Sequence, residues 1–284
     1  MNKIAIIGLS GESVFMNVSE FPEIGETIIA NSIHVEPGGK GYNQAVAVRR
    51  LKGECFFLSA VGNDYYGDEC ERVLKDEGVN YTLIRKNTKT AFATILTNQQ
   101  GENQVIVYPG AKLELSDLDY FEKYIKDADV LLLQLEIPFP IIKKAIQIAK
   151  ENHTYVILNP APATKLDQDI LNNVDLLTPN EGEAKIIFNH HINRDAVVTM
   201  GKDGAILYTN NEQIKIPPLN VKAIDSTGAG DCFNAALAVS IAQGNDLLSS
   251  CQFANIAAAL SVTKNYVIDS LPTKEEVLNY LRKE

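Results

Sequence analysis

Residues 130–163 read VLLLQLEIPFPIIKKAIQIAKENHTYVILNPAPA. Two continuous apolar runs of strand length, 130–135 and 154–158, flank a segment of helical period at 139–152. Continuous apolar strands indicate a sheet covered on both faces, and their alternation with helices is typical of a parallel, doubly wound sheet. Similar runs occur at 4–8, 174–178 and 196–200. The sequence therefore predicts a three-layer α/β fold around a mostly parallel sheet.

Two regions depart from this pattern. Residues 14–36 and 90–108 alternate apolar and polar side chains with turn residues between them, which is typical of antiparallel hairpins. We expect them to form a small second sheet that covers a site, although an extension of the main sheet edge fits the pattern too. With no repeats or linker, we expect one domain over residues 1–284, with lid strands from about 14–36 and 90–108.

The charge and cysteine content narrow the class of protein. The net charge is −10, and the longest run of basic residues is Arg49-Arg50, which argues against a nucleic-acid partner. No uncharged apolar stretch reaches the ~20 residues of a membrane helix, and the N-terminus is typical of a first strand rather than of a secretion signal. Four widely spaced cysteines predict neither disulfides nor structural zinc. We expect a cytoplasmic protein without a membrane partner.

Polar or glycine-rich segments follow five of the predicted strands. Ligands of open parallel sheets bind beyond the carboxyl ends of the strands. Each segment alone can be a turn or a helix start, but together they indicate a shared ligand cleft. The segments are LSGE (9–12), Glu136, NPAPA (159–163), PNEGEA (179–184) and GKDG (201–204).

The stretch DSTGAGDCFNAA (225–236) suggests the chemistry of that cleft. Gly228, Ala229 and Gly230 leave the backbone N–H groups uncovered at the positive end of a helix, which predicts an anion hole. Asp231 follows in the first turn, where it can accept a proton from an attacking hydroxyl group. The alternative is a tight turn in which Asp231 only favours the helix dipole.

A second glycine-rich stretch, EPGGKGYNQAVAVRRL (36–51), also opens a helix. Gly41 after Lys40 breaks the P-loop spacing, and no G-x-G-x-x-G follows a strand. Lys40 and Asn43 suit hydrogen bonds to a polyhydroxylated small molecule. A plain glycine turn between hairpin and helix explains the stretch equally well.

These stretches closely resemble the two signatures of the ribokinase-like (PfkB) carbohydrate kinases. LNPAPA (158–163), TPNEGEA (178–184) and VTMGKDG (198–204) resemble further segments of the ribokinase branch, in the same order. The resemblance covers nearly the whole chain. It implies ATP-dependent transfer of the γ-phosphoryl group to a sugar hydroxymethyl group, with ATP and Mg²⁺ bound and, as in many members, a monovalent cation such as K⁺.

The resemblance also assigns roles by position. It implies Asp231 as the base and the amides of Gly228, Ala229 and Gly230 as the anion hole. Sugar contacts fall on Gly39, Lys40, Asn43 and Glu136, with Gly11 and Ser13 at two further sugar positions; phosphate and magnesium contacts on Asn180 and Glu183; nucleotide contacts on Thr199, Gly201, Gly204 and Asn255; and monovalent-cation contacts on Asp225, Thr227 and Ser270.

Three departures from the family pattern stand out. Gly11 and Ser13 replace an Asn and an Asp that grip the sugar, with Glu12 the only acid nearby, so we expect ribose not to be the best acceptor. The segment KIIFNHHINRD (185–195) is too short for a second helix, which predicts a trimmed nucleotide side. Tyr266-Val267 replaces the usual Gly-Ala turn before Ser270, which alters the cation loop.

Several functions stay open on the sequence. A nucleoside kinase of the same fold would use Phe15 and Phe92 to stack a base, and a catalytically silent sugar-binding regulator would not need Asp231. A Rossmann oxidoreductase is disfavoured because GLSGES (8–13) lacks the required glycine spacing. Apolar lid residues predict a homodimer through the lid rather than a monomer. These residues are Val14, Met16, Ile28, Phe92, Ile95 and Val105.

Overall fold

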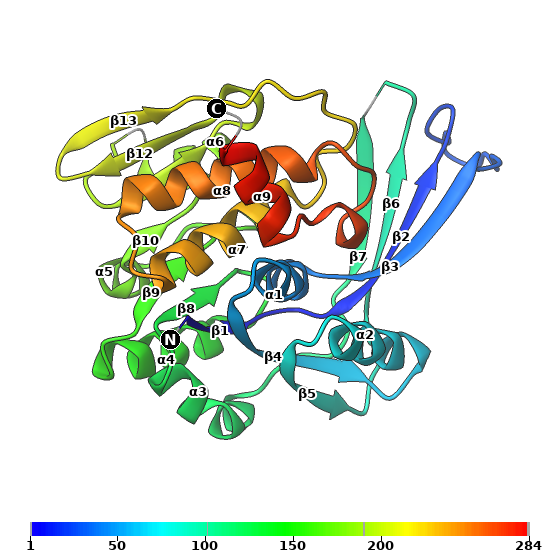
Figure 1. Ribbon diagram of the computed structural model, residues 1–284. Coiled ribbons are helices and arrows are strands. Elements are labelled where there is room, and N and C mark those ends of the chain that lie inside the picture. The colour runs from blue at the N-terminus through cyan, green and yellow to red at the C-terminus, as the bar shows by residue number, and fades with distance from the viewer. Residues whose placement is uncertain (1, 101, 190, 283–284) are drawn as a thin grey trace.

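The computed structural model describes residues 2–100, 102–189 and 191–282. Within these ranges the chain forms a nine-stranded sheet with helices on both faces, and a separate four-stranded sheet at one end (Figure 1). The predicted three-layer α/β fold with a small lid is therefore confirmed. No helix in the described ranges is both long enough and apolar enough to cross a membrane.

The strands of the large sheet are β1 (Lys3–Ile7), β4 (Glu54–Gly62), β5 (Asn80–Lys86), β8 (Val130–Leu133), β9 (Tyr155–Leu158), β10 (Leu176–Leu177), β11 (Ala196–Thr199), β12 (Ala205–Thr209) and β13 (Glu212–Ile216). Those of the lid are β2 (Gly11–Asn17), β3 (Ser32–Gly38), β6 (Ala91–Thr97) and β7 (Asn103–Tyr108). The α-helices are α1 (Lys40–Arg50), α2 (Tyr65–Asp76), α3 (Glu122–Lys126), α4 (Phe139–Glu151), α5 (Gln168–Asn173), α6 (Glu181–Phe188), α7 (Ala229–Ala242), α8 (Leu247–Ser261) and α9 (Lys274–Leu281). Short 3-10 helices span Leu115–Tyr120 (η1), Gly201–Asp203 (η2) and Ile268–Ser270 (η3).

The order of the large sheet is β13-β12-β11-β10-β9-β8-β1-β4-β5. The seven strands from β11 to β5 in this order run parallel to one another, and β12 and β13, at one edge of the sheet, are antiparallel to their neighbours. The chain order reverses at β1, which lies between β8 and β4. A ligand crevice is expected beyond the carboxyl end of β1, at this switch point.

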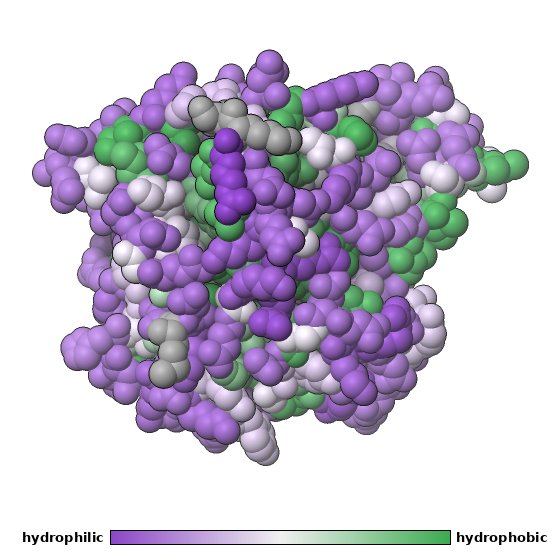
Figure 2. All heavy atoms as spheres, viewed as in Figure 1, coloured by the Kyte–Doolittle hydropathy of each residue, from purple (hydrophilic) through white to green (hydrophobic). Residues whose placement is uncertain are grey.

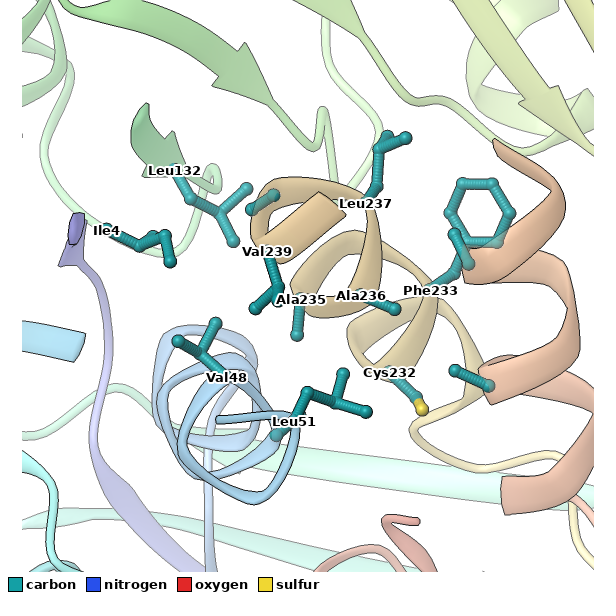
Figure 3. Close-up of a cluster of buried hydrophobic side chains, with 14 of the residues drawn as sticks. Ile4, Val48, Leu51, Leu132, Cys232, Phe233, Ala235, Ala236, Leu237 and Val239 are labelled. Atoms are coloured by element: carbon teal, nitrogen blue, oxygen red, sulfur yellow. The ribbon is translucent and has the colours of Figure 1, made fainter. Parts of the chain in front are cut away.

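Alternate residues of the central strands build one core on each face of the sheet. Ile4 and Ile6 of β1 pack with the cluster formed by α1, α7 and α8, while Ala5 and Ile7 belong to the cluster under α3 and α4. Figure 3 shows side chains of α1 and α7, among them Val48 and Val239, gathered against Ile4 of the sheet. This packing brings the first turns of α1 and α7 to the same sheet edge.

The lid sheet has the order β3-β2-β6-β7. Its two predicted hairpins are antiparallel, but they join through a parallel pairing of β2 with β6. Strand β2 begins at Gly11, earlier than the predicted boundary at residue 14, and follows β1 after a short turn. Because side chains alternate along a strand, Ser13 shares a face with its cross-strand partner Glu36, whereas Glu12 lies on the other face.

The connection from α6 to β11 is short, as the sequence predicts for the end of the sheet that the resemblance relates to a nucleotide. Helix α6 ends at Phe188 and β11 begins at Ala196, with no second helix in the described residues between them. A cavity of about 750 Å³ lies beside this segment, lined by residues of α6, β11, β12 and β13.

Candidate active site

Asp231 lies in the first turn of α7, whose N-cap is Gly228. Gly228 has φ +75°, and a Cβ atom added there would come within 2.4 Å of Val267 Cγ1, so only glycine fits this turn. A Cβ added at Gly230 would meet no atom within 4 Å, which leaves the space before its backbone open. Ala229 N–H already donates to the Ser226 carbonyl at 3.3 Å. The open turn therefore presents Gly228 and Gly230 to an incoming anion more directly than Ala229.

Two amides of α1 hold the Asp231 carboxylate. Asn43 Nδ2 donates to Oδ2 at 2.8 Å, and Gln44 Nε2 donates to Oδ1 at 3.1 Å. Gln44 Oε1 in turn accepts a hydrogen bond from Gln134 Nε2 at 2.5 Å. The bond from Gln134 therefore fixes the orientation of the Gln44 amide, with its oxygen toward Gln134 and its N–H group toward Asp231.

Lys40 is the first residue of α1 and lies among three carboxylates. Asp231 contributes most to raising the pKa of Lys40, followed by Glu136 and Glu183, so the ammonium group stays charged. Burial raises the pKa of the Asp231 carboxyl, while Lys40, Asn43 and Gln44 oppose that shift. Burial also raises the pKa values of Glu136 and Glu183. The site thus combines a charged lysine with buried acids that can take up protons.

A cavity of about 210 Å³ lies in front of Asp231. It brings together many of the predicted residues, because α1, α6, α7 and the ends of β9 to β11 meet here. Its lining includes Lys40, Asn180, Glu183, Thr199, Gly228, Gly230 and Asp231. Asn180 caps α6, with its side chain accepting from Glu183 N while Glu183 Oε2 accepts from Asn180 N, each at 2.8 Å.

A second cavity, of about 540 Å³, shares Thr199 and Gly230 with the first. Its lining also includes the predicted nucleotide residues Gly201, Gly204 and Asn255, together with Phe233 and Val262. A partly apolar cavity that reaches Gly230 in the turn 228–230, which we call the anion turn, suits a nucleotide whose phosphates point toward Asp231.

A third cavity, of about 320 Å³, lies between the main sheet and the lid. Glu136, Leu9 and the lid residue Val107 line it. Glu136 Oε2 accepts a hydrogen bond from Lys40 N at 2.8 Å, so the carboxylate also fixes the start of α1. Gly39, the N-cap of α1, has φ +102° and passes close to the Leu9 carbonyl. The predicted sugar residues Gly11 and Ser13 lie on the lid strand β2 and do not line this cavity.

Comparisons with known proteins agree with this geometry. Residues 1–274 match the pfkB carbohydrate kinase family. The chain is 35% identical to a ribokinase of Bacillus subtilis over 289 residues, which cover 98% of each chain. The chain belongs to the pfkB family of carbohydrate kinases. The predicted enzyme class, an ATP-dependent sugar kinase, is confirmed by this assignment.

Solved structures of pfkB kinases share the whole fold. A ribokinase from Thermotoga maritima is 34% identical with a TM-score of 0.88, covering 99% of this chain and 100% of that chain. An Arabidopsis thaliana ribokinase, solved in complex with ribose and ATP, is 26% identical with a TM-score of 0.88, covering 99% of both chains.

The residues that the pfkB resemblance relates to a monovalent cation are engaged in protein hydrogen bonds. Asp225 Oδ1 accepts from both the N–H and the hydroxyl of Thr227, and Asp225 Oδ2 accepts from Tyr266 N. Ser270 Oγ donates to the Val267 carbonyl at 2.8 Å. Three hydrogen bonds thus occupy the Asp225 carboxylate, the one charged group of this set, which disfavours a K⁺ site there; the hydroxyls of Thr227 and Ser270 donate their hydrogen atoms and keep their lone pairs.

Sequence reasoning missed several side chains around this pfkB site. Gln44 and Gln134 support Asp231, and Glu36 and His34 of β3 contact the loop at Tyr266. A signal for Gln44 was available, because Asn43-Gln44 is a polar pair inside an otherwise apolar helical segment. Nothing local in the sequence pairs Glu36 with a loop more than two hundred residues away.

Glu12 does not replace the missing sugar-gripping acid of β2. It lies on the face of β2 opposite Ser13 and is only 3% exposed, and its Oε2 has no hydrogen-bond partner. Burial, with Glu69 and Glu36 nearby, raises the pKa of Glu12 to about 7. An unpaired buried carboxylate of this kind destabilises the fold when it ionises.

This pKa makes stability depend on pH in a defined direction. The folded protein keeps the Glu12 proton up to about pH 7, whereas the unfolded chain releases it near the ordinary value of 4.5. The free energy of unfolding therefore falls as the pH rises through this window. We expect Glu12→Gln to raise it by roughly 1–3 kcal/mol near pH 8, and by much less near pH 5.

Urea unfolding at both pH values measures the effect. Glu20→Gln, an exposed change in the loop after β2, serves as the control and should leave stability unchanged at both. An equal effect of Glu12→Gln at the two pH values would contradict the titration of this group.

Proposed function

We propose that the protein transfers the γ-phosphoryl group of ATP to a hydroxymethyl group of a sugar, with Asp231 as the base. The main support is the position of Asp231 beneath the open first turn of α7, in a cavity that it shares with Lys40 and that continues into the nucleotide cavity. Glu136, whose pKa the Asp231 carboxylate helps to raise, lines a further cavity beside the lid, where the acceptor would bind.

In this mechanism the sugar hydroxyl gives its proton to Asp231 as its oxygen attacks the γ-phosphorus. A new P–O bond forms to the sugar, and the bond between the γ-phosphorus and the leaving oxygen of ADP breaks. Negative charge grows on the transferred group, where the N–H groups around Gly228 and Gly230, the α7 dipole and Lys40 stabilise it.

The residues present fit a magnesium ion. Glu183 and Asn180 offer hard oxygen atoms to the cavity that Asp231 lines, and Mg²⁺ prefers one or two carboxylates together with phosphate oxygens. The ion supplies charge neutralisation of the phosphates when bound. Glu183 and Asn180, which hold each other through the capping box of α6, orient that side of the cavity.

The lid geometry bears on the nucleoside alternative. Phe92 lies on the face of the lid that turns toward α2, where its ring is 5.3 Å from that of Tyr66. Phe15 is 7% exposed and packs against Tyr266. Phe15 is thus already packed, and Phe92 lies on the lid face opposite Val107, away from the cavity that Glu136 lines, which favours a sugar as the acceptor.

Asp231→Asn should lower kcat by a factor of about 10²–10⁴, because it removes the proton acceptor but leaves the anion turn in place. ATP binding should stay near the wild-type level, measured by calorimetry in parallel. Asp119→Asn, on the exposed 3-10 helix η1, is a matched control with expected wild-type turnover. Near-normal turnover by Asp231→Asn would refute the role of this residue.

Ribose should not be the best acceptor. Gly11 and Ser13 offer no carboxylate, Glu12 faces away, and Glu36 opposite Ser13 is engaged with the loop at Val267. Each lost charge-assisted hydrogen bond is worth about 1.5–3 kcal/mol, so the affinity for ribose should drop by at least about tenfold. An ATP-consumption screen over pentoses, hexoses, keto-deoxy sugars and nucleosides ranks kcat/KM. If ribose gives the highest kcat/KM, the expectation is contradicted. If no acceptor is turned over, a catalytically silent sugar-binding regulator is favoured.

The lid should mediate a homodimer. Its outer strands expose the apolar residues Ile33, Val35, Ile106 and Tyr108, and Figure 2 shows apolar surface at the edge where the lid lies in Figure 1. Val14 and Ile95, expected from the sequence to need cover, are buried within the protomer, whereas Val105 is exposed. Pairing around a two-fold axis buries such a surface. Light scattering at micromolar concentration should give about twice the 31.2 kDa of the chain, and a monomer mass unchanged by substrate would exclude this interface.

A further inference from the structure

The loop that precedes and includes η3 packs directly on the proposed anion turn. Val267 Cγ1 lies 2.4 Å from the position that a Cβ atom of Gly228 would take, and Gly228 is the N-cap of α7. The position of Val267 therefore determines how closely the Gly228 peptide approaches the phosphoryl site. Whatever holds this loop also holds the anion turn.

The backbone N–H groups of the loop point at two carboxylates from different parts of the chain. Tyr266 N donates to Asp225 Oδ2 at 3.0 Å. Val267 N and Ile268 N donate to Glu36 Oε1 and Oε2 at 2.7 and 3.1 Å. Glu36 belongs to the lid strand β3 and is 6% exposed, so one buried side chain ties the lid to the anion turn.

Aromatic contacts reinforce this connection. The ring of His34, also on β3, stacks on the ring of Tyr266 with centroids 3.6 Å apart and an interplanar angle of 9°. Tyr266 has φ +65°, a left-handed conformation that is unusual for a bulky residue. Such a conformation persists where surrounding contacts over-determine it, as the stacked ring and the carboxylates do here.

Two carbonyl groups of the loop, those of Val267 and Ile268, and that of Leu271 after it accept hydrogen bonds from protein donors. Arg50 Nη1 donates to the carbonyls of Ile268 and Leu271, and the Arg50 guanidinium pairs with Glu77. The Val267 carbonyl accepts from both the N–H and the hydroxyl of Ser270. The Arg50 guanidinium thus donates to carbonyl groups in this part of the chain, and Glu36 accepts from its backbone N–H groups.

We propose that Glu36 is a positioning residue of this kinase: together with Arg50 it holds the 266–270 loop against the anion turn, and turnover needs no monovalent cation. The inference rests on the proposed function. In it, Glu36 and Arg50 hold the loop in place of the monovalent cation that the family resemblance suggests. It follows from the loop carbonyls that Arg50 and Ser270 already serve and from the three hydrogen bonds that occupy the Asp225 carboxylate.

The wild-type enzyme tests the cation first. Activity is measured with ATP, Mg²⁺ and the best acceptor of the screen, with tetramethylammonium chloride replaced by KCl or NaCl at constant ionic strength. We expect kcat to change by less than about twofold and the melting temperature to show no K⁺-specific rise. A saturable activation by K⁺ of about tenfold or more, or a K⁺-specific rise in melting temperature, overturns the proposal.

Glu36→Gln tests the positioning role. The variant keeps the shape of the side chain but turns an amide NH₂ group toward the N–H of Val267 or Ile268. We expect kcat to fall by about tenfold or more, with KM for ATP little changed because the nucleotide cavity is lined by other residues. Glu20→Gln, elsewhere on the lid hairpin, should behave as wild type.

The outcomes separate the two proposals. Unchanged kcat in Glu36→Gln overturns the positioning role even if the enzyme is an active kinase. If the wild-type chain phosphorylates nothing, the proposed function fails, while the melting temperature with and without K⁺ still decides the cation part. If Glu36→Gln does not fold, His34→Ala removes the ring that stacks on Tyr266 and contacts the Glu36 carboxylate but leaves the bonds from Glu36 to Val267 and Ile268. It should lower kcat without changing KM for ATP, and unchanged kcat there counts against the proposal.

Discussion

The hydrogen bonds from Asn43 and Gln44 to Asp231 are the interaction on which the site depends. They join the first turns of α1 and α7, which are separated by most of the chain, and they do so in a buried environment where an unpaired carboxylate is costly. The reversal of strand order at β1 makes this contact available, since it brings α1 and α7 to the same sheet edge. Gln134 extends the network back into the sheet, so the orientation of Asp231 is linked to the central strands.

Lys40 and the buried acids around it set the charge balance of the cleft. Lys40 lies near three acids, and the resulting field keeps the lysine charged while burial works against ionisation of Asp231, Glu136 and Glu183. Burial raises the pKa of Asp231, and Lys40, Asn43 and Gln44 oppose that shift. A carboxylate with a raised pKa is suited to receive a proton when a hydroxyl group attacks. The arrangement costs stability in the free protein, as is common where function requires buried charge.

The lid is more than a cover for the cleft. Its strand β3 carries Glu36 and His34, which reach the loop that packs on the anion turn. On the lid face that carries Ser13, the cross-strand partner Glu36 is a buried carboxylate, and it accepts hydrogen bonds from the backbone N–H groups of Val267 and Ile268. The Glu36 carboxylate is therefore used in holding the loop that packs on Gly228.

The sequence by itself determined the layer architecture, the five strand exits and the two glycine-rich helix starts. These features depend on local physics: apolar periodicity, glycine backbone freedom and the helix dipole act within a few residues. The resemblance to pfkB kinases added the enzyme class, which the family match confirms. Only the tertiary structure decided the parallel joining of the two lid hairpins, the burial of Glu12 on the lid face opposite Ser13, the support of Asp231 by Gln44, and the bonds that Val267 and Ile268 donate to Glu36. Each of these depends on which face a strand presents and on which distant segment packs against it. A pattern of neighbouring residues does not contain that information, because it is settled when the sheet, the helices and the lid pack together.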